Sequence, residues 1–109
     1  MPYSESLAER IRRILKQRPD IQEKKMFGGV VFMLNGNMLV GIWKQSLIVR
    51  LGAEQAKEAL KQPFVGEFDI TGKPMKGWVI VEPDGIDYEK DLREWIEKGE
   101  KFVETLPAK

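Results

Sequence analysis

The chain has 109 residues, a formal net charge of +1, 42% apolar and 32% charged residues, and neither cysteine nor histidine. This length fits one hydrophobic core, and the composition is that of a folded globular domain. The missing residue types exclude disulfides, thiolate metal sites, thiol nucleophiles and the side chain that most often transfers protons near neutral pH. We therefore expect one domain over residues 1–109 that is not an enzyme and holds no cofactor and no metal.

The amino-terminal residues lack the features of a targeting segment. Met1 to Glu5 contain no basic stretch and no apolar run of the kind found in signal peptides. No apolar run approaches the roughly 18 residues that cross a bilayer. The sequence predicts a cytoplasmic protein with no membrane contact.

The charges are unevenly distributed. Residues 1–25 carry seven basic and four acidic groups, whereas residues 82–109 carry nine acidic and five basic groups. Two interpretations are open: solvated helix faces, or a basic first helix that contacts nucleic acid. The near-zero net charge favours the first, because nucleic-acid binding relies on many basic groups at the phosphate backbone.

The first predicted element is a helix over about residues 5–17. Apolar residues between Leu7 and Leu15 recur on one helical face. Ser6 is typical of a helix N-cap, and Ser4 is an alternative start one turn earlier. Pro19 ends the helix.

A β-hairpin is the strongest local pattern. Two β-rich runs, residues 30–34 and 38–43, flank Asn35-Gly36, a pair that accepts the positive φ angles of a type I′ turn. A two-residue turn sets Leu34 opposite Asn37 and, counting onward, places the apolar residues on two faces. One face carries Val30, Phe32, Leu34, Leu39, Gly41 and Trp43. The other carries Val31, Met33, Met38, Val40 and Ile42.

Both faces of this predicted hairpin are apolar, whereas a sheet with one wet side shows polar alternation. Helices, a terminus or a second copy of the chain must therefore cover the second face. A homodimer is one expected partner.

The rest of the chain alternates strands and helices. It predicts strands at 47–51, 67–70 and 78–81, a helix at 53–60 and a long helix from 88 to 106. Gly99, inside the apolar stripe of the last helix, predicts a bend or close approach to the sheet. The order α-β-β-β-α-β-β-α indicates an α+β two-layer sandwich, with a mainly antiparallel sheet packed against helices.

Four ordered blocks resemble the TfoX/Sxy amino-terminal domain family. They are residues 24–32 (KKMFGGVVF), 34–38 (LNGNM), 47–52 (LIVRLG) and 71–79 (TGKPMKGWV). The resemblance implies a two-layer fold similar to that of secretion chaperones and an association with competence regulation in bacteria. Longer family members add a helical carboxy-terminal domain. Because this chain stops at Lys109, we expect a free-standing amino-terminal domain.

The first group of candidate binding residues precedes the hairpin. Lys24 and Lys25 could bind phosphate or an acidic partner, or could simply be a solvated strand start. Phe27, Gly28 and Gly29 lack the ending of a phosphate-binding loop and lead into a strand. That context favours a bulge or close strand approach, with Phe27 as a packing residue.

Arg50 is the most conspicuous single candidate, because it interrupts an otherwise apolar strand. If Gln45-Ser46 form a two-residue turn, Gly41 faces Arg50 and leaves room for its guanidinium to reach an anion. The alternative is a structural arginine at the sheet rim, paired with a carboxylate such as Asp69.

Met75, Lys76 and Trp78 form the third group of candidates. Methionine and tryptophan are frequent at binding surfaces, so these residues could line a partner groove. They could equally pack in the core.

These observations favour a non-enzymatic regulatory domain that binds a protein partner, for which transcription machinery is a candidate. One alternative is a domain that binds a small anionic ligand through Arg50 with Lys24, Lys25 or Lys76. The other is nucleic-acid binding through the basic first helix.

Overall fold

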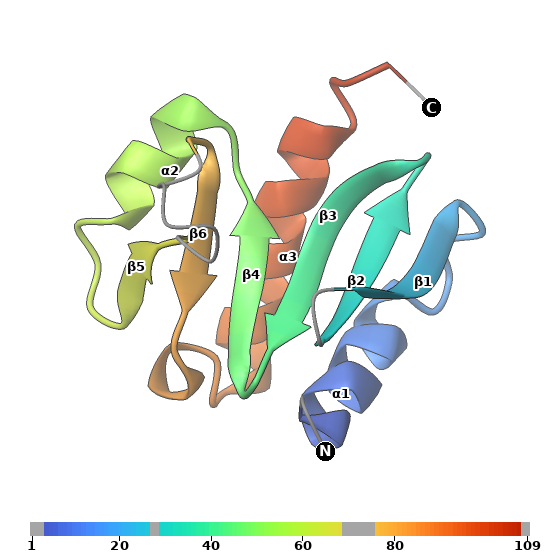
Figure 1. The fold of residues 1–109 in the computed structure, drawn as a ribbon, viewed down its shortest axis with the longest axis horizontal. Coiled ribbons are helices and arrows are strands. Elements are labelled where there is room, and N and C mark those ends of the chain that lie inside the picture. Colours follow the sequence, from blue (N-terminus) through green and yellow to red (C-terminus); the bar gives the residue numbers. More distant parts are fainter. Residues whose placement is uncertain (1–3, 27–28, 69–75, 108–109) are drawn as a thin grey trace.

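The computed structural model describes residues 4–26, 29–68 and 76–107. In chain order the elements are α1 (Glu5–Leu15), β1 (Ile21–Met26), β2 (Gly29–Leu34), β3 (Asn37–Trp43), β4 (Ser46–Arg50), α2 (Ala53–Ala59), β5 (Val65–Glu67), β6 (Trp78–Val81), the 3₁₀ helix η1 (Pro83–Gly85) and α3 (Glu89–Val103). They confirm the α+β class (Figure 1). None of the helices in these ranges is long and apolar enough to cross a membrane.

The strands form one open antiparallel sheet in the order β1-β2-β3-β4-β6-β5. The edge strand β1 was not predicted, because four of its six residues are polar or charged. It forms because all six residues pair with β2, from Ile21 opposite Leu34 to Met26 opposite Gly29. Pairing with a neighbour thus outweighs low intrinsic strand propensity.

The turn at Asn35-Gly36 is as predicted. Asn35 and Gly36 have φ angles of 53° and 84°. Leu34 lies opposite Asn37. This is the local geometry that a type I′ turn requires.

The predicted division of the hairpin into two faces was wrong from Val40 onward. A register shift between Phe32 and Met33 places Phe32 opposite Val40 instead of Leu39. One extra residue in a strand exchanges the faces of everything after it. Val40 and Ile42 therefore join the side of Phe32, and Gly41 moves to the other side.

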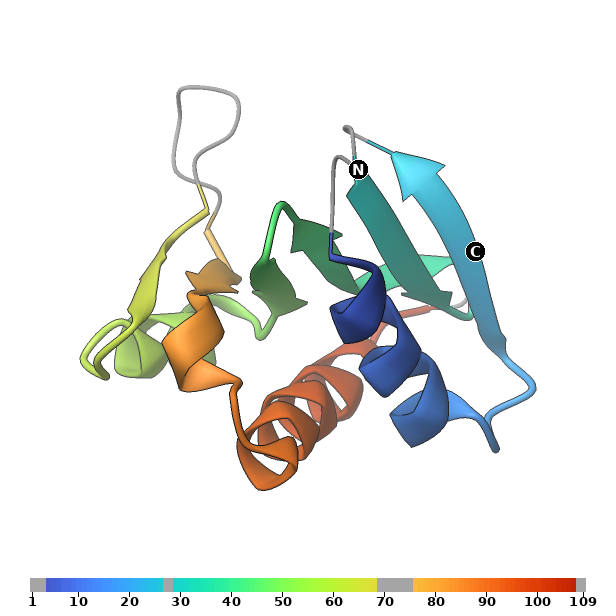
Figure 2. The ribbon, with the colours of Figure 1, turned by 90° about the horizontal axis from the view of Figure 1, so that it is seen from below.

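The helices lie on one side of the sheet. Figure 2 shows α1 and α3 next to each other beneath it, and Figure 1 shows α3 behind β3 and β4. Buried residues of all three helices share one core with Leu51, which follows β4, and with the sheet residues Val30, Phe32, Leu34, Leu39, Val40, Ile42, Leu47, Val49, Val79 and Val81. A helix that covers this face explains why its strand residues are apolar.

Gly99 allows α3 to approach the sheet closely, as predicted. A Cβ atom at this position would lie 3.1 Å from Leu39 Cδ1 and 3.2 Å from Val49 Cγ1. Both distances are shorter than ordinary van der Waals contact. The glycine therefore sets how near α3 packs to β3 and β4.

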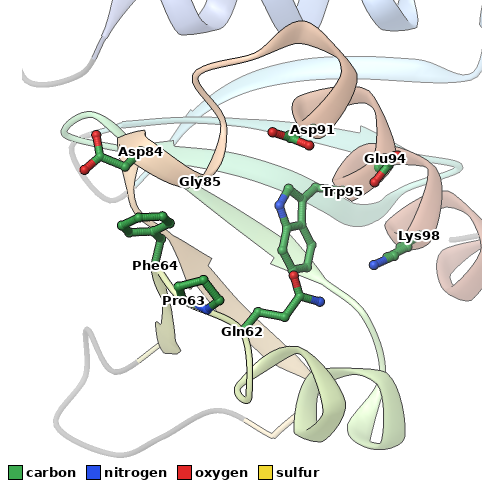
Figure 3. A pocket seen from close by; sticks show the side chains of 9 residues that line it. All are labelled: Gln62, Pro63, Phe64, Asp84, Gly85, Asp91, Glu94, Trp95 and Lys98. Atoms are coloured by element: carbon green, nitrogen blue, oxygen red, sulfur yellow. The ribbon is translucent and has the colours of Figure 1, made fainter.

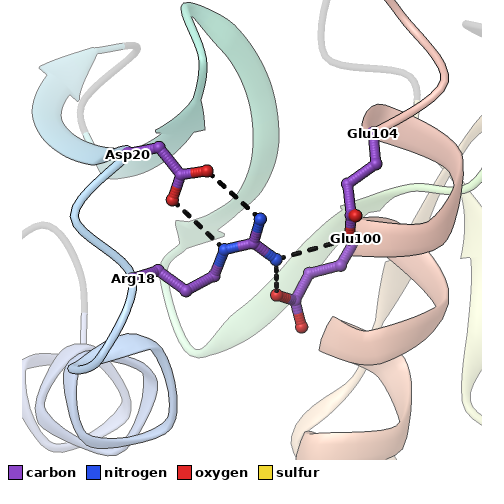
Figure 4. A network of polar contacts seen from close by, with 4 residues as sticks. All are labelled: Arg18, Asp20, Glu100 and Glu104. Atoms are coloured by element: carbon purple, nitrogen blue, oxygen red, sulfur yellow. Dashed lines mark hydrogen bonds and ion pairs between the residues drawn. The ribbon is translucent and has the colours of Figure 1, made fainter.

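Arg18 ties the α1–β1 connection to α3 (Figure 4). Its guanidinium donates to both carboxylate oxygens of Asp20 at 3.2 Å, to Glu100, and to Glu104 at 3.4 Å. The hydrogen bond from Arg18 lowers the pKa of Asp20 below its ordinary value. In return, hydrogen bonds to Asp20 and Glu100 raise the pKa of Arg18.

The opposite face of the sheet is also apolar. Val31 and Ile48 are buried, and Met33, Met38 and Trp43 are half-buried. Within the described ranges no helix lies over this face (Figure 2).

Candidate functional site

The structure separates the predicted binding residues into two places. Arg50 ends β4 and Trp78 begins β6, the adjacent strand, with Lys76 two residues before it. Lys24 and Lys25 are exposed on β1, four strands away from β6, which is about 19 Å at the usual strand spacing.

Three predicted residues, Phe27, Gly28 and Met75, lie outside the described residues. Gly29 is the first residue of β2, buried opposite Met26 of β1. Because β1 and β6 are four strands apart, a small ligand cannot contact the candidates on both strands.

Arg50 lies beside Trp78. The two residues are opposite each other in the β4–β6 ladder. The guanidinium carbon of Arg50 lies 5.1 Å from the Trp78 ring centroid and 5.9 Å from that of Phe102 on α3. Both contacts are within cation–π range, so the half-buried guanidinium lies against two aromatic rings.

The prediction that Gly41 faces Arg50 was wrong. Trp43 pairs with Ser46, so the turn is Lys44-Gln45, and Lys44 takes the positive φ of 60°. Gly41 consequently faces Ile48. The shift by one turn residue moves Arg50 past the end of the β3 pairing.

No ion pair of Arg50 occurs within residues 4–26, 29–68 and 76–107. Its predicted alternative partner, Asp69, is outside these ranges.

Trp78 is held from two sides. Besides Arg50, it contacts the buried Phe68, with ring centroids 6.0 Å apart and planes tilted by 43°. Such tilted aromatic pairs add about 1 kcal/mol to simple burial. These two contacts fix the position of the Trp78 indole, and the side chain remains half-buried.

Gly77 lies between Lys76 and Trp78 and shapes the backbone where the chain enters β6. It has a φ of 87°, and its carbonyl accepts hydrogen bonds from the N–H groups of Leu51 at 2.8 Å and Gly52 at 3.1 Å. Glycine takes this left-handed conformation without steric cost. The segment is thereby fastened to the start of α2.

Between α2 and this segment lies a groove of about 340 Å³. Its α2 wall consists of Ala53, Ala56, Lys57 and Leu60. Its other wall consists of Glu67, Lys76, Gly77 and Trp78. We call this the α2–β6 groove.

The walls of the α2–β6 groove combine large apolar side chains with a charged rim. Leu60 and Trp78 supply large apolar surfaces. Lys57, Lys76 and Glu67 are exposed around them, so the rim has one net positive charge. Such a groove can bury an apolar side chain and attract neighbouring acidic groups.

The contribution of α2 was missed in the sequence. A leucine at the end of a predicted amphipathic helix is expected to face the core, but Leu60 exposes 36% of its surface at the groove. Ala56 and Ala59 alone face the core, as their helical spacing predicts. The signal that could have indicated an exposed Leu60 is its position at the end of a seven-residue helix, followed by Lys61 and Gln62.

Much of the basic charge near α1 is neutralised within the chain. Arg12 donates to both oxygens of Glu23 at 2.8 and 2.7 Å, and this hydrogen bonding lowers the pKa of Glu23. Arg10 pairs with Glu89 at 3.3 Å, and Arg18 has the three partners described above. These contacts favour solvated, ion-paired helix faces over a nucleic-acid surface.

The model of the TfoX N-terminal domain family matches residues 13–103, which include both walls of the α2–β6 groove. Searches of curated proteins and of solved structures found no match. A family match over most of the chain agrees with the resemblance seen in its four sequence blocks. The chain belongs to the TfoX N-terminal domain family.

Proposed function

We propose that this domain binds a protein partner through the α2–β6 groove. The bound segment presents one large apolar side chain flanked by acidic residues. The observation that carries the proposal is a preformed groove whose two walls each supply a large apolar side chain, Leu60 and Trp78, beside exposed lysines.

The groove suits a single anchoring side chain. Its volume of about 340 Å³ accepts a leucine or an aromatic ring and lies at the lower end of the range for small-molecule pockets. Burying such a side chain contributes about 2 kcal/mol. Interfaces commonly draw most of their binding energy from a few anchors of this kind.

The rim selects the sequence around the anchor. Lys57 and Lys76 are exposed on opposite walls and can each meet a carboxylate of the partner. Exposed pairs add little affinity, but they raise the association rate and disfavour basic segments. The predicted ligand is therefore acidic as well as apolar.

Family membership supports a regulatory role for this binding. The TfoX family resemblance implies competence regulation, and a domain that regulates without catalysis must act through contacts with other macromolecules. We propose that the partner belongs to the transcription machinery.

Selection from a random peptide library tests the proposal. Peptides that bind the domain should share an apolar or aromatic residue next to aspartate or glutamate. Leu60→Glu should weaken their binding at least tenfold, since it places a charge on the apolar wall of the groove. Tyr88→Glu is the matched control, because Tyr88 is 73% exposed and lies outside the groove.

An anionic small molecule is the second candidate ligand. Arg50 contacts the Trp78 ring, and Lys76 lines the same groove as this ring, so two cationic side chains lie in the region of one indole. In that case small dicarboxylates or phosphate should raise the melting temperature of the wild type. The Arg50→Ala and Lys76→Ala variants should lose this effect while keeping their fold.

The second apolar sheet face supports a further proposal, self-association. Met33, Met38 and Trp43 are half-buried there in one copy of the chain. Light scattering should show a dimer at high concentration. A monomer at all concentrations would remove this proposal and leave the groove proposal intact.

A further inference from the structure

A second cavity lies among the loop after α2, η1 and the first turns of α3 (Figure 3). Its volume is about 200 Å³. The residues that bear on its chemistry are Phe64, Asp84, Asp91, Glu94, Trp95 and Lys98. We call it the Trp95 pocket.

The Trp95 pocket is acidic. It is lined by the carboxylates of Asp84, Asp91 and Glu94, none of which forms an ion pair within the described part of the chain. Its one lysine, Lys98, places its ammonium 4.9 Å from the Trp95 ring centroid. The lining has a net negative charge, which favours a cationic ligand.

The indole of Trp95 supplies an independent indication of a ligand. The residue is only 6% exposed, yet among hydrogen bonds of the described residues none has its N–H as donor. Every fully buried side-chain nitrogen or oxygen in that part of the chain has a partner. The indole nitrogen must therefore be accessible, and in Figure 3 it lies on the ring edge that faces Phe64.

An accessible indole N–H on a buried side chain can donate to an acceptor that enters the pocket. Tryptophan N–H groups usually find a hydrogen-bond partner when the ring is buried. The lining carboxylates are acceptors, but none of them receives this bond. A ligand that carries a carbonyl oxygen next to a cation would satisfy both the indole and the carboxylates.

Phe64 places a second aromatic ring at the pocket mouth. It has a φ of 68°, a conformation that costs a non-glycine residue about 1 kcal/mol. The N–H of Glu82 donates to its carbonyl at 2.8 Å and holds it in place. The ring is left 44% exposed, where it can contact a cation.

The lining disfavours three kinds of ligand, namely a metal ion, a polyamine and a cofactor-sized molecule. In the described ranges no three acidic side chains are grouped so as to hold a metal ion. A polyamine offers cations but no acceptor for the indole. The volume is also below the roughly 300 Å³ where pockets for cofactor-sized ligands begin.

We propose that the Trp95 pocket binds an arginine or lysine side chain of a peptide segment. The cationic group meets the carboxylates of Asp91 and Glu94, and a main-chain carbonyl of the segment accepts from the Trp95 N–H. This site is independent of the α2–β6 groove, which lies elsewhere and favours acidic segments.

Two-dimensional NMR of ¹⁵N-labelled protein tests the proposal, because each tryptophan indole gives its own signal and Trp95→Phe identifies the relevant one. The probes are blocked Gly-Arg-Gly, the same peptide with citrulline in place of arginine, and spermidine. The arginine peptide should move the Trp95 indole signal in a saturable way at millimolar concentration. Citrulline should move it at least tenfold less, and spermidine should leave the indole proton unshifted.

Variants separate the pocket from general charge attraction. Glu94→Gln should weaken arginine-peptide binding about threefold, because an exposed charge-assisted contact is lost. Glu97→Gln, an exposed change on the same helix outside the pocket, should have no effect. Equal responses of the two variants, equal binding of citrulline, or a saturable indole shift with spermidine would each overturn the proposal.

Discussion

Arg50 and Trp78 lie opposite each other across the β4–β6 ladder, with the guanidinium carbon 5.1 Å from the indole centroid. The same indole forms a wall of the α2–β6 groove. Arg50 also approaches Phe102 of α3. Arg50 thus connects Trp78, in the groove wall, to Phe102 on α3. Its contact with the indole fixes the position of Trp78.

Replacing Arg50 by methionine keeps an extended apolar side chain but removes the charge over two rings. We expect the free energy of unfolding in urea to fall by about 1 kcal/mol, the usual value of a partly desolvated cation–π contact. Arg93→Met, an exposed change on α3, is the control and should have little effect. Equal stability of the two variants would show that the ring contacts of Arg50 contribute nothing.

Arg18→Met should destabilise the fold more than a typical surface change. Arg18 bonds three carboxylates on two distant segments, so a network and not a single pair is lost. We expect a loss of about 1 kcal/mol, the upper end for exposed pairs, and a smaller loss in 1 M salt. Arg13→Met, an exposed change within α1, serves as the control. A salt-independent loss would contradict an electrostatic role.

The fold should lose stability on acidification below about pH 4. Hydrogen bonds from Arg18 and Arg12 lower the folded-state pKa values of Asp20 and Glu23, so the unfolded chain binds more protons in this range. Their stabilising contribution is full above the unfolded pKa values of about 3.9 and 4.3 and is lost as the pH falls through the folded values. Urea titrations from pH 3 to pH 7 measure it. Asp20→Asn should flatten this dependence; an unchanged slope would refute the assignment.

Gly99→Ala should destabilise the domain even though alanine favours helices. The new methyl group would meet Leu39 and Val49 at 3.1 and 3.2 Å. Overpacking of this kind typically costs about 1–3 kcal/mol, against a helix gain of about 1 kcal/mol. Gly66→Ala is a matched control, because its Cβ would have only Ile80 nearby, at 3.8 Å. Thermal unfolding should rank Gly99→Ala below Gly66→Ala, and the reverse order would contradict the packing argument.

The sequence predicted the elements whose signals are local. The Asn35-Gly36 turn and the helices appear where residue spacing and turn chemistry place them. Strand β1 was missed because its pairing with β2 is a tertiary interaction that its polar sequence does not encode. The hairpin faces were assigned wrongly because a register shift at Phe32 leaves no mark in the pattern of apolar residues.

The candidate site could be predicted only in part. Arg50 and the pair Lys76 and Trp78 were separate candidates in the sequence, and the strand order brings them onto the adjacent strands β4 and β6. The packing of α2 beside Lys76 and Trp78 is a tertiary contact that has no signal in the sequence. The Trp95 pocket was not anticipated at all. It depends on Phe64 meeting residues of η1 and α3.

Fluorescence anisotropy of a labelled peptide from the library selection tests the α2–β6 groove most directly. The wild type and Tyr88→Glu should bind this acidic, apolar peptide with equal affinity, and Leu60→Glu should bind at least tenfold more weakly with an unchanged melting temperature. Undiminished binding by Leu60→Glu, or equal weakening by Tyr88→Glu, would contradict the groove as the site of partner recognition.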